Sequence, residues 1–176
     1  VIYVYDSYHN PPNEWAGLLA PWGDFTIRST SLDAIVFCLW VERQHDQYLA
    51  DGGFDGAYTY FAAEGMTYGS STRNWPEMAR EAVKYGTSFV PSVGPGYCDV
   101  RVRPWNAQST RARDGGNYFK NMFHAATSVA PSIISITSWN EWHEGSNIEP
   151  AVPKQVGQTK YEDYGESGPR MYLDLV

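Results

Sequence analysis

Short runs of apolar, aromatic and β-branched residues recur along the chain and alternate with longer stretches of mixed polarity. Within each run the apolar character is nearly continuous, which is typical of strands in a parallel sheet that is buried on both faces. The pattern predicts five such strands, at residues 1–5, 34–40, 57–61, 88–93 and 133–138.

The stretches between these strands are helical in composition or periodicity, and they cover residues 12–19, 43–50, 76–85 and 118–129. The third is the clearest. Asn74 stands at the N-cap position, Pro76 suits the first turn, and Gly86 follows as a stop. The apolar side of this helix, which we expect to face the sheet, comprises Met78, Ala79, Ala82 and Val83.

Strands that alternate with helices favour an α/β fold with right-handed crossovers. No linker or break in composition divides the chain, so residues 1–176 are predicted to form a single domain. The phosphate-binding motifs GxGxxG and GxxxxGK(S/T) are absent, which leaves a (β/α)8 barrel as the common remaining architecture. Such barrels take about 250 residues. We therefore expect only about the last five strand–helix units of a barrel, with the earlier strands preceding Val1.

Charge and composition narrow the classes of partner. Acidic residues outnumber basic ones 20 to 13, and no two basic residues are adjacent, so a nucleic-acid-binding surface is not expected. No apolar run approaches the roughly 20 residues that span a bilayer, so no membrane contact is predicted for this segment. Cys38 and Cys98 lie among apolar or aromatic residues, which favours free buried thiols over a disulfide.

The densest polar cluster follows the last predicted strand, where residues 138–145 read SWNEWHEG. Barrel active sites are built at the carboxyl ends of strands. Glu141 and Glu144 are three residues apart and can point into one pocket. Neighbouring carboxylates push their pKa values apart, so that one can serve as an acid while the other serves as a base. The alternative interpretation is that both are solvated loop charges.

Competing chemistries lack their defining residues. His143 and Glu144 begin an HExxH zinc motif, but Asn147 stands where the second histidine is required. No GxSxG motif occurs, and the four histidines are scattered without ligand spacing. The sequence therefore predicts neither a metal nor another cofactor.

The chain is rich in aromatic residues, with 7 Trp, 13 Tyr and 7 Phe. This content favours a sugar ligand, because pyranose rings stack on aromatic faces while carboxylates and amides bind their hydroxyls. Tyr60, Tyr97 and Trp142 fall near predicted strand ends, although each alone is better explained as a core residue. Gly94 and Gly96 permit a tight turn that aims Tyr97 at the pocket, and a purely structural turn is the alternative.

Taken together, these motifs resemble glycoside hydrolase family 99, the endo-α-1,2-mannosidases. The similar segments follow one order along nearly the whole chain, at residues 3–8, 58–61, 91–97, 103–106 and 139–145. His143 favours this family over related barrel domains, which carry a small residue at its position. The likeness is greatest to the animal Golgi members.

The resemblance implies a (β/α)8 barrel, of which this chain matches strands four to eight. It implies a retaining, endo-acting glycosidase of the Golgi lumen that cleaves internal α-1,2-mannosidic bonds of glucosylated N-glycans. The expected partner is a mannose-containing oligosaccharide or N-glycoprotein. By similarity, Glu141 is the base that deprotonates the sugar's own 2-hydroxyl, which attacks the anomeric carbon to give a 1,2-anhydro sugar. Glu144 is the acid for the leaving oxygen and then the base that activates water.

Under this mechanism, Tyr60 and, second, Tyr97 are candidates for a hydroxyl that binds a catalytic carboxylate or the substrate. Asn140 and His143 are expected to hold sugar hydroxyls and orient the glutamates, while Trp142 lines the pocket wall. The spacing suits the chemistry, because the 2-hydroxyl and the glycosidic oxygen are on adjacent carbons. A second hypothesis is an inactive or carbohydrate-binding remnant of a barrel.

Overall fold

Parallel strands form the centre of the molecule. The computed structural model describes residues 1–161 and 163–176. One parallel sheet holds, in chain order, β1 (Ile2–Val4), β2 (Val36–Leu39), β3 (Gly56–Tyr58) and β4 (Ser88–Val90). A second parallel sheet pairs β5 (Ser92–Val93) with β6 (Ser135–Ile136). Each of the predicted strand segments therefore contains or overlaps a strand.

The fourth predicted strand is divided at Pro91. Proline has no N–H to donate to a neighbouring strand, so the ladder is interrupted there. As a result β4 pairs with β3, whereas β5 pairs with β6. The Pro91 carbonyl accepts a hydrogen bond from Ser135 N–H at 3.1 Å, and Ser92 N–H donates to Thr59 Oγ1 at 2.9 Å. The strand order thus continues from the first sheet into the second.

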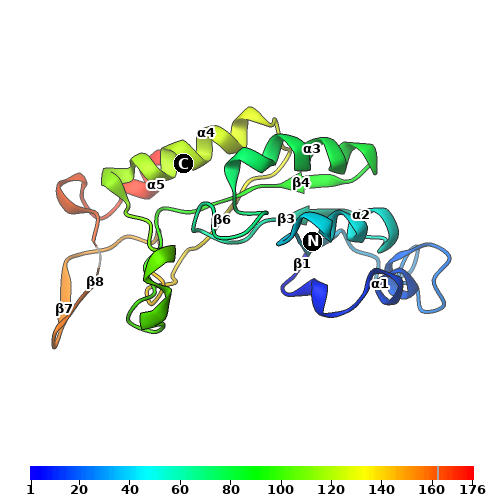
Figure 1. Cartoon of the computed structure of the whole chain (residues 1–176), viewed down its shortest axis with the longest axis horizontal. Helices are drawn as coiled ribbons and strands as arrows, with labels where there is room; N and C mark the ends of the chain where they lie inside the picture. Colours follow the sequence, from blue (N-terminus) through cyan, green and yellow to red (C-terminus); the bar gives the residue numbers. More distant parts are fainter. Residues whose placement is uncertain (162) are drawn as a thin grey trace.

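Helices follow the strands at nearly the predicted positions. Their bounds are α1 (Pro12–Leu19), α2 (Gln47–Asp51), α3 (Trp75–Lys84) and α4 (Asn117–Ser128). The helix predicted at 43–50 begins as a 3₁₀ turn, η2 (Arg43–Asp46), which continues into α2. Figure 1 shows α3 and α4 along the same side of the sheet. This is the layer arrangement of consecutive strand–helix units.

Asn74 is the N-cap residue of α3, as predicted. The Asn74 side chain makes no capping hydrogen bond, and its Nδ2 donates instead to the Tyr68 carbonyl at 2.9 Å. The side chain makes no capping bond because the 3₁₀ turn η3 (Thr72–Asn74) leads directly into α3, so the Asn74 backbone is already helical. The side chain of an N-cap residue reaches the free N–H groups of the helix when the backbone of that residue is extended. At the other end Gly86 has φ +69° and ends the helix, as predicted.

The predicted apolar side of α3 is confirmed except at one position. Met78 and Ala82 are buried, and Ala79 packs against the core from a partly buried position. Val83 was expected on this side but is 76 % exposed. The contact stripe of α3 is therefore narrower than the helical spacing alone predicts.

The main core lies between the helices and the sheet. Trp75 of α3 and Phe119 of α4 are almost fully buried in it, together with Trp40 and Phe89. The rings of Trp40 and Phe89 meet edge to face, with their centroids 6.4 Å apart. Burial of such large side chains supplies most of the free energy that holds the helices on the sheet.

Strand β2 is buried on both faces. Val36 and Cys38 belong to the helix-side core, whereas Phe37 and Leu39 belong to a separate cluster. Successive strand side chains point to opposite faces, so a continuous apolar run requires cover on both. The prediction from the run is thus confirmed. Cys38 and Cys98 are free thiols, also as predicted, although Cys98 is only partly buried.

Several elements have no counterpart in the predicted set. An antiparallel hairpin joins β7 (Lys154–Val156) to β8 (Thr159–Tyr161), and a short helix, α5 (Met171–Leu175), follows. The remaining 3₁₀ turns are η1 (Ser7–His9), η4 (Pro104–Ser109), η5 (Asp114–Gly116) and η6 (Gly165–Ser167). None of the described helices combines the length and the apolar character needed to cross a bilayer.

Candidate active site

The two predicted catalytic glutamates lie on a loop that directly follows β6, and we call residues 138–149 the glutamate loop. Backbone bonds close this loop on itself, because Ser138 N–H donates to the Ser146 carbonyl at 2.9 Å and Ile148 N–H donates to the Ser138 carbonyl at 3.0 Å. The Ser138 hydroxyl oxygen also accepts from Glu141 N–H at 2.9 Å. Gly145, at φ +61°, lets the chain turn immediately after Glu144. The loop is therefore a fixed platform for both carboxylates.

Glu144 forms an ion pair with an arginine from another part of the chain. Arg103 Nη1 donates to Glu144 Oε1 at 2.8 Å, and the same nitrogen donates to Asp99 Oδ2 at 3.1 Å. The Glu144 side chain is 22 % exposed, which leaves it accessible to a ligand. Its backbone carbonyl accepts from Cys98 N–H at 2.7 Å, so the segment before Arg103 is also bound to the loop.

Asp99 is the buried partner in this arrangement. It is 0 % exposed, and its Oδ2 accepts hydrogen bonds from the Tyr97 hydroxyl at 3.1 Å, from Asn106 Nδ2 at 2.9 Å and from Arg103. Burial alone would raise the pKa of Asp99. The hydrogen bonds from Asn106, Arg103 and Tyr97 outweigh it and hold that pKa below its ordinary value. Asp99 is therefore a permanent buried anion.

Tyr97 is buried beneath the site and supports it, rather than lining an open pocket. It is 6 % exposed, packs with Ala62 and Ala63, and donates its hydroxyl to Asp99. Its backbone exchanges two hydrogen bonds with Arg111, at 2.9 and 2.7 Å. The Gly-rich turn does direct Tyr97 toward the glutamate region, but the hydroxyl supports Asp99.

Tyr60 is partly buried, and its ring meets that of Tyr5 edge to face with the centroids 4.9 Å apart. Its pKa is raised, first by burial and then by the charges of Tyr5, Glu144 and Glu141. The phenol is therefore a neutral hydroxyl near both carboxylates, although it makes no hydrogen bond to either of them. Its backbone has φ +58° and is held by a bond from Tyr60 N–H to Ser92 Oγ at 2.7 Å. This bond holds Tyr60 in a left-handed backbone conformation that non-glycine residues rarely adopt.

The remaining predicted residues line the rim of the glutamate loop. Asn140 and His143 are exposed, and the backbone N–H of His143 donates to Glu141 Oε1 at 3.2 Å. Trp142 is partly buried, and its indole N–H donates to Glu149 Oε1. The loop therefore brings Glu141, Glu144 and these three neighbours together, as the sequence predicts.

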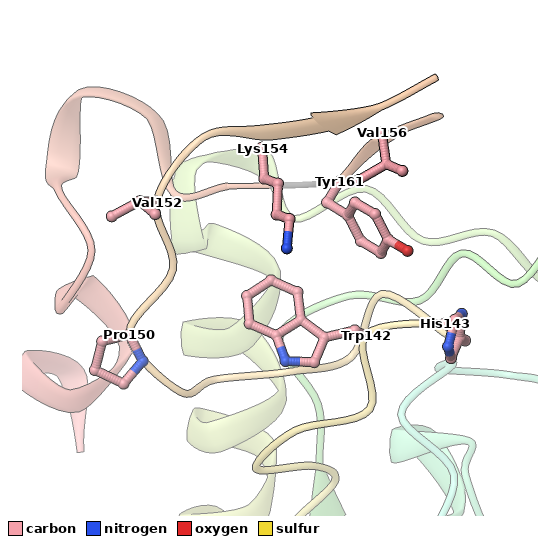
Figure 2. Close-up of a pocket in the computed structure, with 7 residues that line it drawn as sticks. All are labelled: Trp142, His143, Pro150, Val152, Lys154, Val156 and Tyr161. Atoms are coloured by element: carbon pink, nitrogen blue, oxygen red, sulfur yellow. The ribbon is translucent and has the colours of Figure 1, made fainter. Parts of the chain in front are cut away.

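A groove opens between the glutamate loop and the β7–β8 hairpin, as Figure 2 shows. Its volume is about 390 Å³, and it is lined by Trp142, His143, Pro150, Val152, Lys154, Val156 and Tyr161. In Figure 2 the Lys154 amine points from the hairpin toward the Trp142 ring. The groove is mostly apolar, and two of its lining residues, Trp142 and His143, stand between Glu141 and Glu144 in the sequence.

Arg101 fastens the hairpin to the glutamate loop. Its Nη2 donates to the Trp142 carbonyl at 2.9 Å and its Nη1 to the Lys160 carbonyl at 3.2 Å. Its guanidinium carbon lies 4.9 Å from the centre of the Tyr161 ring, a cation–π distance. Arg101 therefore connects the two segments that border the groove.

The chain is similar to known proteins over its full length. The sequence model of glycosyl hydrolase family 99 matches residues 1–176, the full chain. The chain belongs to glycoside hydrolase family 99. It is 49 % identical over its whole length to the glycoprotein endo-α-1,2-mannosidases of Xenopus laevis and of Mus musculus. It is 50 % identical to a glycoprotein endo-α-1,2-mannosidase-like protein of Danio rerio.

The family assignment extends to structure. The GH99 endo-α-mannosidase from Bacteroides thetaiotaomicron is 43 % identical and superposes with a TM-score of 0.94 over 98 % of this chain and 51 % of that one. The predicted fold class is thereby confirmed, with these parallel strands and helices as part of a TIM-type barrel. The chain spans 38 to 40 % of the length of the curated relatives it matches. The prediction of a single domain stays a prediction.

Sequence reasoning missed some residues of this candidate site and gave no role to others. Arg103 stood within a segment that resembles the family but was given no function, and Asp99 and Arg101 were not singled out. The alternation of charged and apolar residues from Asp99 to Arg103 was a usable signal, since three charges so close to a strand end are unlike a buried turn. Within the described residues, no group of three His, Cys, Asp or Glu side chains is placed to hold a metal ion.

Proposed function

We propose that this chain carries the catalytic glutamates of a retaining endo-α-1,2-mannosidase that acts on glucosylated N-glycans. The observation that carries the proposal is the pair Glu141 and Glu144 on one closed loop, with Arg103 and the neutral phenol of Tyr60 beside them. The loop follows a strand of a barrel, where such enzymes hold their reacting groups. The names of the similar proteins supply the substrate class.

The proposed reaction has two steps. In the first, Glu141 takes the proton of the sugar 2-hydroxyl, and that oxygen attacks the anomeric carbon. The glycosidic bond breaks, and its oxygen receives the proton of Glu144. In the second, the Glu144 carboxylate takes a proton from water, whose oxygen opens the 1,2-anhydro ring at the anomeric carbon. Glu141 returns its proton to the 2-oxygen. Two inversions give net retention, and no carboxylate becomes a nucleophile.

Several contacts support these roles. The N–H of His143 steadies Glu141, and Arg103 orients Glu144 from outside the loop. The exposed side chains of Asn140 and His143 are free to bind sugar hydroxyls at the rim. Trp142 forms one wall of the adjacent groove, where a second sugar ring of the glycan can stack on its face. An endo-acting enzyme needs such binding positions beyond the cleaved bond.

We further propose that the reaction takes place in the Golgi lumen, during the processing of N-glycoproteins. It is supported by the similarity to animal glycoprotein endo-α-1,2-mannosidases. Location is testable by expressing the tagged protein in animal cells and comparing it with Golgi markers. Retention in another compartment would contradict it.

The decisive test offers the protein that carries this chain a glucosylated high-mannose N-glycan and analyses the products. We expect release of a glucosylated mannose oligosaccharide whose new reducing end first appears in the α configuration. A matched activated substrate with fluorine at the 2-position should be neither cleaved nor trapped. A stable adduct on Glu141 or Glu144 by mass spectrometry would contradict the anhydro-sugar route. Binding of the glycan without cleavage would instead support the carbohydrate-binding alternative.

A further inference from the structure

One guanidinium nitrogen is shared between two carboxylates of very different surroundings. Arg103 Nη1 lies 2.8 Å from Glu144 Oε1 and 3.1 Å from Asp99 Oδ2. Asp99 is completely buried, whereas Glu144 is 22 % exposed. The arginine therefore links a fixed interior anion to a proposed proton-transfer group.

The geometry of this link is set by local backbone contacts. The Asp99 carbonyl accepts from Val102 N–H at 2.8 Å and from Arg103 N–H at 2.7 Å, so the turn that carries Arg103 closes on Asp99. Asn106, in η4, binds the same Asp99 oxygen and receives the Ser109 hydroxyl at 2.7 Å. Arg103 thus reaches Glu144 from a braced support rather than from a free loop.

We propose that Asp99 and Arg103 form a positioning pair that sets the proton affinity of Glu144 in the reaction, with Arg103 favouring the carboxylate and Asp99 moderating that effect. This inference rests on the proposed role of Glu144. When Glu144 gives its proton to the leaving oxygen, the new carboxylate is stabilised at once by Arg103. The same carboxylate then acts on water. A full positive charge would make the protonated acid scarce before the first step, and the buried negative charge of Asp99 offsets part of it.

Arg103 is the cation that donates to the Glu144 carboxylate, and neutral phenols lie nearby. Burial, followed by the charge of Glu144, raises the pKa of Tyr97, and burial, Asp6 and Glu144 raise that of Tyr5. These phenols stay neutral over the working range of a glycosidase. The charge of Glu144 reaches Tyr5, Tyr60 and Tyr97, the charge of Glu141 also reaches Tyr60, and Asp99 binds the arginine nitrogen that Glu144 shares.

The test is the dependence of kcat/KM on pH, measured on the natural glycan with the protein that carries this chain. Arg103→Gln keeps a hydrogen-bond donor and removes the charge, so the alkaline limb should move to higher pH by about one unit, or tenfold in proton affinity. Arg103→Lys keeps the charge and should leave the limb near its original position. A uniform fall in kcat/KM with an unmoved limb in Arg103→Gln would overturn the proposal, because a merely structural arginine gives that result.

Asp99→Asn gives a shift of opposite sign. Loss of the buried negative charge strengthens the effect of Arg103 on Glu144, so the alkaline limb should move to lower pH by about half a unit. An upward shift would contradict the moderating role of Asp99. The matched control is Arg43→Gln, which breaks an arginine–glutamate pair of 2.6 Å at the surface, far from the site in sequence. It should leave both limbs in place.

Infrared difference spectroscopy separates this inference from the proposed function. The carboxylate band of Glu144, assigned by comparison with Glu144→Gln, is followed against pH without substrate. If the protein cleaves no mannoside but the Glu144 titration moves upward in Arg103→Gln, the inference stands and the function fails. If the protein cleaves mannosides and the titration does not move, the function stands and the inference fails.

Discussion

The helix-side core and the glutamate loop are held together by different forces. In the core, Met78 and Phe119 are buried among other apolar side chains and need only shape and volume to fit. Around the glutamate loop, Asp99, Arg103 and Glu144 are held by directional bonds between residues up to 41 positions apart. The first region tolerates changes that preserve volume, whereas the second fails when a single donor is lost. Stability and activity should therefore respond to separate sets of substitutions.

The largest effect should come from Glu141→Gln. The substituted amide cannot take the proton of the 2-hydroxyl, so kcat/KM should fall by on the order of 10⁴, the upper end for general base catalysis. The loss should be as large on an activated aryl mannoside as on a natural glycan, because both need the same internal attack. Thermal unfolding should be unchanged. A large drop in Tm would mean that the loop also carries the stability of the domain.

A core substitution should give the reverse result. Trp75→Ala removes a fully buried ring whose N–H donates to the Gly69 carbonyl at 2.8 Å, so the free energy of unfolding should fall by about 3–5 kcal/mol. The folded fraction should keep its kcat. Denaturant unfolding measures the first effect and active-site-normalised kinetics the second. The control is Trp105→Ala, whose side chain is 78 % exposed and should change the free energy far less.

Glu144→Gln should separate substrates by their leaving groups. On a natural glycan the lost proton donor should lower kcat/KM by on the order of 10² to 10⁴. On a substrate with an acidic phenol, which departs without protonation, the loss should be much smaller. Comparison of the two substrates in one assay measures the difference. Equal losses would assign Glu144 a role other than the general acid.

The smallest effect should come from the groove. Trp142→Ala removes the aromatic wall that faces the hairpin and should raise KM for a long glycan by about tenfold, the value of one lost stacking contact of 1–1.5 kcal/mol. A short substrate that ends at the cleaved bond should be affected less. Val156→Ala is the milder companion on the opposite wall. A fall in kcat alone would place Trp142 in the chemistry instead.

The same difference explains what could be predicted from the sequence. A strand that is buried on both faces has a continuous apolar run, and a helix that packs on one face has apolar residues at helical spacing. These two patterns were sufficient to place β2 and α4. Pro91 could have indicated the break between β4 and β5. The β7–β8 hairpin was missed because its strands are short and mostly exposed, which leaves Gly157 as the main turn signal.

The candidate site was predictable only where it is local. Glu141, Trp142, His143 and Glu144 are neighbours in sequence, so one motif identified them together. The Arg103–Glu144 contact depends on how two separate loops meet, and no spacing in the sequence indicates it. The hydroxyl of Tyr97 is an example, because its position near a strand end was correct while its partner, Asp99, could not be read from the turn.

The attachment of the hairpin has a consequence for how specificity can diverge within the family. Arg101 holds the carbonyl groups of residues 142 and 160, which every amino acid supplies. Mutation at the groove-facing positions of the hairpin can therefore alter size, charge or polarity without detaching it from the glutamate loop. Selection can act on the lining of the groove and on the catalytic residues independently. Members of the family can therefore acquire preferences for new glycans through a few substitutions in the hairpin, while the catalytic residues and their chemistry stay the same.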